Sequence, residues 1–162
     1  MRLVVVAYML RDERNLSDIA SISSMLGAEC VCVERPGGPP APKGCRAVDG
    51  GGLTAALRGC RVVVLETYGE RLVVEGLPCG GCLAVVVGAE DFGVPRGLAD
   101  ELGAEVYQIP VAAEGMSYNV VSSLVMALYE LARGCGGRDG PEDAHVPGSE
   151  DPPGYDGLRA YE

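Results

Sequence analysis

Carboxylate and amide side chains in two glycine-containing segments are the groups of this sequence best placed to do chemistry. The first segment, residues 88–95, reads Gly-Ala-Glu-Asp-Phe-Gly-Val-Pro and carries Glu90. The second, residues 109–119, begins with Ile-Pro-Val and ends with Ser117, Tyr118 and Asn119. Glycines let a backbone approach a ligand closely, although neither segment has the spacing of a dinucleotide-binding or phosphate-binding loop. These residues predict ligand-binding loops. The alternatives are a tight connection for the first and helix capping by Ser117 or Asn119 for the second.

The elements that must position these loops follow from the apolar pattern. Continuous apolar runs at residues 3–8, 30–33, 62–65 and 83–87 predict strands that are covered on both faces, and residues 106–109 predict a further strand, stopped by Pro110. Residues 15–27, 53–57, 96–102 and 119–133 predict helices between or after them. This alternation predicts an α/β domain with a mostly parallel sheet and helices on both faces. Ligands of such sheets bind beyond the carboxyl ends of the strands, so we expect the site in the loops after residues 65, 87 and 109.

Local signals refine these elements. Ser17 is expected to cap the first helix and Gly27 to end it. Residues 36–46, rich in proline and glycine, are expected to hold no regular structure. The last helix should bury one apolar stripe, formed by Val120, Val121, Leu124, Val125, Leu128 and Leu131.

Charge divides the chain of 162 residues, whose net charge is −10, into two parts. Residues 1–134 carry 11 basic and 16 acidic residues, and residues 135–162 carry 2 basic and 7 acidic residues. We therefore expect one folded domain over residues 1–134 and a flexible acidic tail, rich in glycine and proline, over residues 135–162. The only histidine, His145, lies in that tail and is expected to be solvated rather than catalytic.

Hydropathy predicts a soluble, cytoplasmic protein. The longest apolar run, residues 3–10, has eight residues and is too short to span a membrane. Charged residues 11–14 follow at once, without the small-residue cleavage site of a signal peptide.

Seven cysteines include a single C-x-x-C pair, Cys79 and Cys82. A zinc site would need a second pair or histidines at ligand spacing, and the sequence has neither, so we expect no metal. Structural thiols, a disulfide and a redox dithiol remain open. Disulfides inside a cell are typical of hyperthermophiles.

Taken together, the two loops resemble motifs of the SpoU/TrmH branch of the SPOUT RNA methyltransferases. The second family motif is an apolar strand followed by G-N-E-x-x-G-L-P, and residues 85–95 here read Val-Val-Val-Gly-Ala-Glu-Asp-Phe-Gly-Val-Pro. The third motif is I-P-M, then S-L-N-V and Y-E, which residues 109–111, 117–120 and 129–130 match in order. The weaker first motif places an Asn twelve residues before a Gly, as Asn15 and Gly27 are placed here.

The resemblance implies a fold, a cofactor and a reaction. It implies a deep trefoil knot, an exception to the rule against knotted chains, that holds S-adenosylmethionine (AdoMet). It implies methyl transfer to a ribose 2′-hydroxyl of RNA by a homodimer, with no metal. By position, Leu65, Gly88, Ile109 and Ser117 would line the cofactor site. Asn15, Glu90 and Asn119 would lie near the reacting centre or organise the knot. With no added RNA-binding domain, transfer RNA is a more plausible substrate than ribosomal RNA. A branched side chain at Gly88 would then occupy ligand volume and leave the fold mostly intact.

Three departures from the family pattern bear on catalysis. The family's motif-one Arg, thought to help deprotonate the ribose hydroxyl, falls on Ser21, while Ala89 and Tyr118 replace the family's Asn and Leu. If the chain is active, Arg11 or Arg14 would stand in for that Arg. The alternative is a catalytically impaired protein of this fold that binds RNA or a protein partner, with or without AdoMet.

RNA binding would also need cations on an otherwise acidic body. Besides Arg11 and Arg14, the candidates for a local basic patch are Arg35, Lys43, Arg46 and Arg96.

Overall fold

The structure, a computed structural model, describes residues 1–111 and 116–135. The predicted tail from residue 136 onward, including His145, lies outside the described residues, as do residues 112–115. The predicted division into a domain and a tail therefore stays a prediction.

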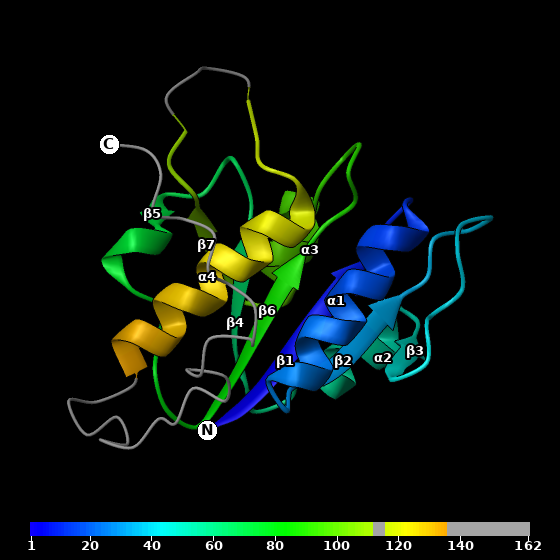
Figure 1. The fold of residues 1–162 in the computed structure, drawn as a ribbon, viewed down its shortest axis with the longest axis horizontal. Coiled ribbons are helices and arrows are strands. Elements are labelled where there is room, and N and C mark those ends of the chain that lie inside the picture. Colours follow the sequence, from blue (N-terminus) through cyan, green and yellow to red (C-terminus); the bar gives the residue numbers. More distant parts are fainter. Residues whose placement is uncertain (112–115, 136–162) are drawn as a thin grey trace, which may run out of the picture.

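Seven parallel strands form one sheet, in the order β3-β2-β1-β6-β4-β7-β5. The strands are β1 (Arg2–Tyr8), β2 (Glu29–Val33), β3 (Cys45–Val48), β4 (Arg61–Leu65), β5 (Arg71–Leu72), β6 (Cys82–Val87) and β7 (Glu105–Gln108). Figure 1 shows β1 and β6 side by side in the middle of the sheet. Because all strands run the same way, the loops after β4, β6 and β7 meet at one edge of the sheet.

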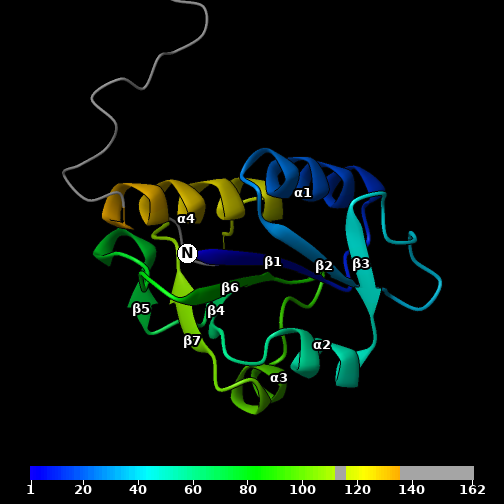
Figure 2. The same cartoon turned by 90° about the horizontal axis from the view of Figure 1, so that it is seen from below.

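Two layers of helices cover the sheet, and this arrangement confirms the predicted α/β class. Helices α1 (Glu13–Met25) and α4 (Val120–Cys135) lie on one face, and α2 (Gly50–Ala56) and α3 (Arg96–Glu101) lie on the other, as Figure 2 shows. A short 3-10 helix, η1 (Val73–Glu75), follows β5. No helix in the described residues is long and apolar enough to cross a membrane.

The strands bury both faces, as their continuous apolar runs predict. Val5 and Ala7 of β1 belong to the core under α1 and α4, whereas Val4 and Val6 belong to the core under α2 and α3. The stripe on α4 is confirmed in part. Its buried members are Leu124, Leu128 and Leu131, but the side chain of Val125 is 46% exposed.

Two predictions from local sequence signals were wrong: the residue that caps α1 and the extent of the loop at residues 36–46. Asp12, not Ser17, caps α1, because its carboxylate accepts from the backbone N–H of Arg14 at 2.8 Å. Gly27 follows the helix with a φ of +63°, as expected of a glycine at a helix end. The prediction that residues 36–46 hold no regular structure was wrong at the end of the segment, since β3 begins at Cys45 and pairs with β2.

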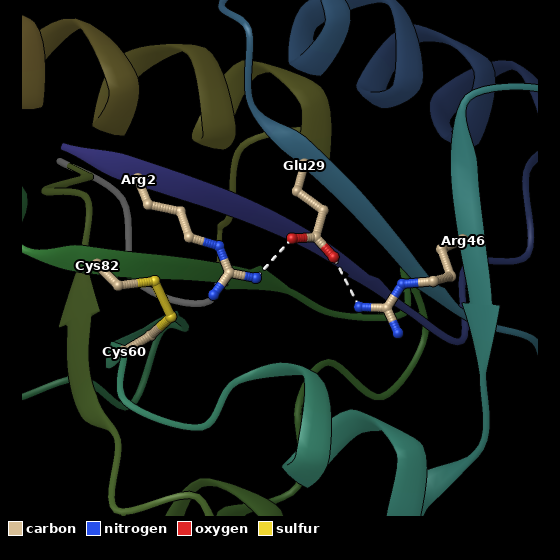
Figure 3. Close-up of polar contacts among 5 residues, drawn as sticks. All are labelled: Arg2, Glu29, Arg46, Cys60 and Cys82. Carbon is tan, nitrogen blue, oxygen red and sulfur yellow. Dashed lines mark hydrogen bonds and ion pairs between the residues drawn. A yellow bond between two sulfur atoms is a disulfide. The ribbon is translucent and has the colours of Figure 1, made fainter.

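An ion-pair network fastens the amino-terminal ends of three strands (Figure 3). Glu29, the first residue of β2, accepts from Arg2 of β1 and from Arg46 of β3, each at 2.6 Å. The two guanidinium groups lower the pKa of Glu29. Exposed pairs contribute little individually, but a shared carboxylate restrains both neighbouring strands.

The other half of the sheet repeats this arrangement. Glu105, at the start of β7, pairs with Arg61 of β4 at 2.5 Å and with Arg71 of β5 at 3.0 Å. Between the two networks a disulfide joins Cys60 and Cys82 at the starts of β4 and β6 (Figure 3). The amino-terminal edge of the sheet is therefore linked by side chains within two groups of strands, β3-β2-β1 and β6-β4-β7-β5, opposite the edge that carries the predicted loops.

Two further disulfides settle the cysteine alternatives. Cys30 pairs with Cys45 across β2 and β3, and Cys79 pairs with Cys135 at the end of α4. The two cysteines of the C-x-x-C sequence thus have different partners, so the hypothesis of a redox dithiol is wrong. Only Cys32 stays a thiol, and burial raises its pKa to about 11.

Candidate active site

A cavity of about 820 Å³ opens at the carboxyl ends of β4, β6 and β7 and at the start of α4. This volume lies within the range of small-molecule sites. Its walls include Leu65 at the end of β4, Val87 at the end of β6 and Ile109 just after β7. Ser117 and Asn119, which precede α4, complete that side. The place predicted for the site from the sequence therefore coincides with a cavity in the structure.

The loop after β4 holds the loop at residues 88–95 by both backbone groups of Val94. The Glu66 carboxylate accepts from the Val94 N–H at 2.5 Å, and the Tyr68 hydroxyl donates to the Val94 carbonyl at 2.6 Å. The backbone N–H of Glu66 in turn donates to the carbonyl of Tyr107 in β7 at 2.9 Å. The three strand-end loops are thus joined to one another.

Gly88 is needed for packing within the protein itself. A Cβ at this position would lie 2.5 Å from the backbone nitrogen of Val94 and 2.8 Å from the Cα of Gly93. Gly88 is not among the residues that line the cavity. The expectation that a branched side chain here would leave the fold mostly intact is therefore wrong, because it would collide with backbone rather than fill ligand volume.

Glu90 connects the second motif to the first. Its carboxylate accepts from the backbone N–H groups of Arg11 at 2.7 Å and Asp12 at 3.1 Å, and from the Asn15 side-chain amide at 2.9 Å. Partial burial raises its pKa, but these hydrogen bonds outweigh that effect and the net pKa is lowered. Glu90 is therefore an ionised acceptor that holds the start of α1 against the cavity wall.

Asn119 brings the third motif to the same point. Its amide nitrogen donates to the Asn15 side-chain oxygen at 3.2 Å, and its own side-chain oxygen accepts from the Val121 N–H at 2.8 Å. Asn119 thus both caps α4 and lines the candidate site. Asn15, Glu90 and Asn119, which are far apart in the sequence, form one hydrogen-bonded cluster beside the cavity.

The arginines and Ser21 are placed differently. The backbone N–H of Arg11 donates to Glu90 of this cluster and that of Arg14 donates to Asp12, while both residues are exposed and neither lines the cavity. The Ser21 hydroxyl donates to the Ser17 carbonyl within α1 at 3.0 Å. Among the described residues that line the cavity there is no Arg, Lys or His.

Sequence reasoning missed Glu66. It directly follows β4, at the carboxyl end of a strand where ligands are expected, and this position was the only signal that could have found it. Burial raises its pKa, partly offset by hydrogen bonds from the backbone N–H groups of Val94 and Thr67.

The ion pair of Arg35 was not predicted either. Arg35, after β2, forms two hydrogen bonds of 2.9 Å to Asp91 and lies 5.4 Å from the centre of the Phe92 ring. Of the predicted basic patch, Arg35 and Arg46 are thus neutralised by ion pairs, and Arg96 stacks on Tyr68 at 4.2 Å.

Neither a protein-family model nor a curated protein matches this sequence. Solved structures do resemble it. A protein solved to explain the 2-OH methylation of C/U34 on tRNA has a TM-score of 0.69 and 22% identity, covering 82% of this chain and 95% of that chain. An AdoMet-bound rRNA methyltransferase from Sinorhizobium meliloti has a TM-score of 0.68 and 22% identity, covering 82% of this chain and 56% of that one.

The SpoU methyltransferase AviRb from Streptomyces viridochromogenes, solved with AdoMet, is similar to the same degree. Its TM-score is 0.68 at 18% identity, covering 82% of this chain and 57% of that one. This chain therefore spans little more than half of the last two proteins. At these identities the likeness is one of fold, and this chain has the fold of the SpoU methyltransferases.

Proposed function

We propose that this protein transfers a methyl group from AdoMet to a ribose 2′-hydroxyl of RNA, with transfer RNA as the substrate. The observation that carries the proposal is the cluster of Asn15, Glu90 and Asn119. Three segments that resemble the three family motifs supply one residue each, and they converge beside a cavity of ligand size. Fold alone would not support this, since one fold hosts many functions.

The residues of the cavity fit AdoMet. Leu65, Val87 and Ile109 offer an apolar wall to an adenine ring, and the free backbone groups of the strand ends can bind its edge. The polar lining groups include the carboxylates of Glu66 and Glu90, which suit a positively charged ligand better than a phosphate. We propose that Leu65, Ile109 and Ser117 contact the cofactor directly, and that Gly88 shapes the loop around it.

The bound cofactor would supply an activated methyl group on a sulfonium, so the protein needs to align a hydroxyl and assist the loss of its proton. Asn119 lines the cavity and its amide can orient a ribose, while Asn15, bonded to it at 3.2 Å, holds that amide in place. Glu90 has its oxygens occupied by three N–H donors and a lowered pKa, so we assign it a positioning role. Arg14, next to Asn15 in the sequence, or Arg11, at the start of the same segment, is the proposed cation for the hydroxyl.

RNA would approach over exposed cations near this edge. Arg11, Arg14 and Lys43 are exposed, and no ion pair joins them to a carboxylate in residues 1–111 and 116–135. The likeness to a protein studied for methylation of a transfer RNA supports that substrate class. Such a substrate places the protein in the cytoplasm, where its three disulfides would be unusual outside hyperthermophiles.

We further propose a homodimer and a trefoil knot. Apolar side chains stay exposed along α4 and the segment before it, including Met116 at 62%, Val125 at 46% and Tyr129 at 65%. A second copy of the chain would cover them. For the knot, the support is close backbone contact between strand-end loops. A Cβ at Gly69 would lie 2.6 Å from the backbone carbon of Tyr107.

A catalytically impaired protein is the second candidate, favoured by one observation. The Ser21 hydroxyl, in place of the family Arg, is bonded within its own helix. In addition, the lining residues that the structure describes include no cation. This candidate binds RNA or a protein partner and transfers no methyl group.

Two assays test the proposal in order. Calorimetry with AdoMet should show one site per chain. Labelled AdoMet should then transfer its methyl group to transfer RNA that lacks modifications. Binding without transfer to any RNA would favour the impaired protein, and absence of AdoMet binding would overturn the proposed function. Light scattering should give twice the mass of one chain, and a monomer would contradict the homodimer.

A further inference from the structure

Three carboxylates line the cavity, and they differ in the groups that hold them. Glu90 accepts three hydrogen bonds, from the backbone N–H groups of Arg11 and Asp12 and from the Asn15 side-chain amide, which together lower its pKa. Asp91 is held by two hydrogen bonds from the Arg35 guanidinium, each 2.9 Å long. The third carboxylate, Glu66, stands apart from both arrangements.

Glu66 has hydrogen bonds but no cation. It accepts from the backbone N–H of Val94 at 2.5 Å and from that of Thr67. Within the described part of the chain no ion pair reaches it, and its pKa is raised by burial, with no guanidinium or ammonium acting against that effect. Burying an uncompensated charge destabilises the folded protein.

The charged and titratable groups around Glu66 do not neutralise it. On its own loop Tyr68 is neutral, and on the neighbouring loop Glu90 and Asp91 are acidic. Arg96 of α3 stacks on the Tyr68 ring at 4.2 Å and does not contribute to the pKa of Glu66. Glu66 is therefore a partly buried carboxylate of the cavity wall with two backbone donors and no cation, and a cationic ligand can balance its charge.

We propose that the Glu66 carboxylate selects the cationic cofactor over its neutral product, so that AdoMet enters and S-adenosylhomocysteine (AdoHcy) leaves. This inference rests on the proposed function. The two molecules differ by one methyl group, and therefore by the charge of a sulfonium against a neutral thioether. Apolar walls distinguish a single methyl group only weakly, whereas an unpaired carboxylate interacts with the charge itself.

The variant Glu66→Gln separates this role from a structural one. Its side-chain oxygen can still accept from the Val94 N–H, and its shape is unchanged, so the loop at residues 88–95 keeps its support. The variant loses the negative charge, and one carboxylate oxygen becomes an NH2 group. Because that charge is partly buried without a cation, we expect the variant to melt at a higher temperature than the parent at neutral pH.

Calorimetry should measure the affinities of AdoMet, AdoHcy and an analogue that carries an ammonium in place of the methylated sulfur. We expect the preference for AdoMet over AdoHcy to fall about tenfold in Glu66→Gln, and the preference for the ammonium analogue to fall with it. Glu101→Gln, which removes an exposed carboxylate of α3 outside the cavity, is the matched control and should keep the parent's preferences.

A second measurement needs no variant. In the parent protein the preference for AdoMet should be weak while Glu66 is protonated and should grow as pH rises through its raised pKa, above the ordinary value of 4.5. AdoMet binding near that pKa should release protons to the buffer, and AdoHcy binding should release fewer.

The outcomes separate the two claims. If the parent binds both ligands but Glu66→Gln keeps the preference, or if the parent's preference does not change with pH, the role of Glu66 is refuted and the proposed function stands. If the parent binds neither ligand, both are refuted. A lowered preference in Glu66→Gln together with an unchanged one in Glu101→Gln supports the inference.

Discussion

Replacing Glu90 by alanine should loosen the start of α1 and weaken the protein by about 2 kcal/mol. The change leaves three N–H donors without their acceptor. In the parent, their nitrogens lie 2.7, 2.9 and 3.1 Å from the Glu90 carboxylate oxygens. Hydrogen bonds to a charged group contribute about 1.5–3 kcal/mol each when they are buried. Glu90 is an exposed residue, so water replaces part of what is lost, and we count less than 1 kcal/mol for each donor.

The pH dependence of this loss has a definite sign. The pKa of Glu90 is lowered in the folded protein, so its contribution is complete above the ordinary value of 4.5 and disappears as the pH falls through the lower, folded value. The difference in stability between the parent and Glu90→Ala should therefore shrink on acidification. Glu90→Gln keeps one acceptor oxygen and should lose less stability than the alanine variant at neutral pH.

Urea unfolding at neutral and at acidic pH measures these differences. A loss of about 2 kcal/mol corresponds to a fall of about 7 °C in the melting temperature of a domain of this size. Glu101→Ala, which removes an exposed carboxylate on α3, controls for the change of net charge. A difference between parent and Glu90→Ala that is absent at neutral pH, or that grows on acidification, would refute the reasoning.

Three further predictions concern other parts of the molecule. Gly88→Val should lower the melting temperature sharply in a thermal scan, since its side chain would collide with backbone, and a fold as stable as the parent would contradict the packing described here. Cys135→Ser should weaken the oxidised protein by about 4 kcal/mol in urea, the entropy of a loop of 56 residues, and should have no effect after reduction. Single-turnover methyl transfer at saturating RNA should be slower than in the parent for one of the two variants Arg11→Ala and Arg14→Ala. If only RNA affinity falls, the residue contacts phosphate, and if nothing changes in either variant, neither replaces the family Arg.

The fold was predictable because the apolar runs are continuous. Strands such as residues 83–87, which have no polar residue, can only be covered on both faces, and this requires helices on each side of the sheet. The edge strands β3 and β5 were not predictable, since they are short, partly exposed and depend on pairing with a neighbour. Glycine and proline before β3 hid it further.

The site was predictable in its location and only partly in its roles. Asn15, Glu90 and Asn119 were chosen from motif positions, and the structure places them in one cluster. Glu90 accepts from the backbone N–H groups of residues 11 and 12, and this contact depends on the turn after β1. In that turn Met9 has a φ of +52°, which is rare for a residue other than glycine. Such a conformation leaves no trace in the sequence.

Glu66 and the disulfides show the same limit. The raised pKa of Glu66 arises from burial beside the loop at residues 88–95, more than twenty positions away in the chain. The pairing of Cys79 with Cys135 joins segments that are 56 residues apart. Spacing along the sequence favoured a local C-x-x-C unit. The disulfide partner of each cysteine is instead decided by which ends of strands and helices lie together in the fold.

Mass spectrometry of the nucleosides of transfer RNA, after incubation with the protein and AdoMet, tests the central claim most directly. The claim predicts one new nucleoside whose added methyl group stays with the ribose when the base is released, and it predicts none with RNA alone. A methyl group found on a base, or no new nucleoside in transfer RNA despite AdoMet binding, would contradict it.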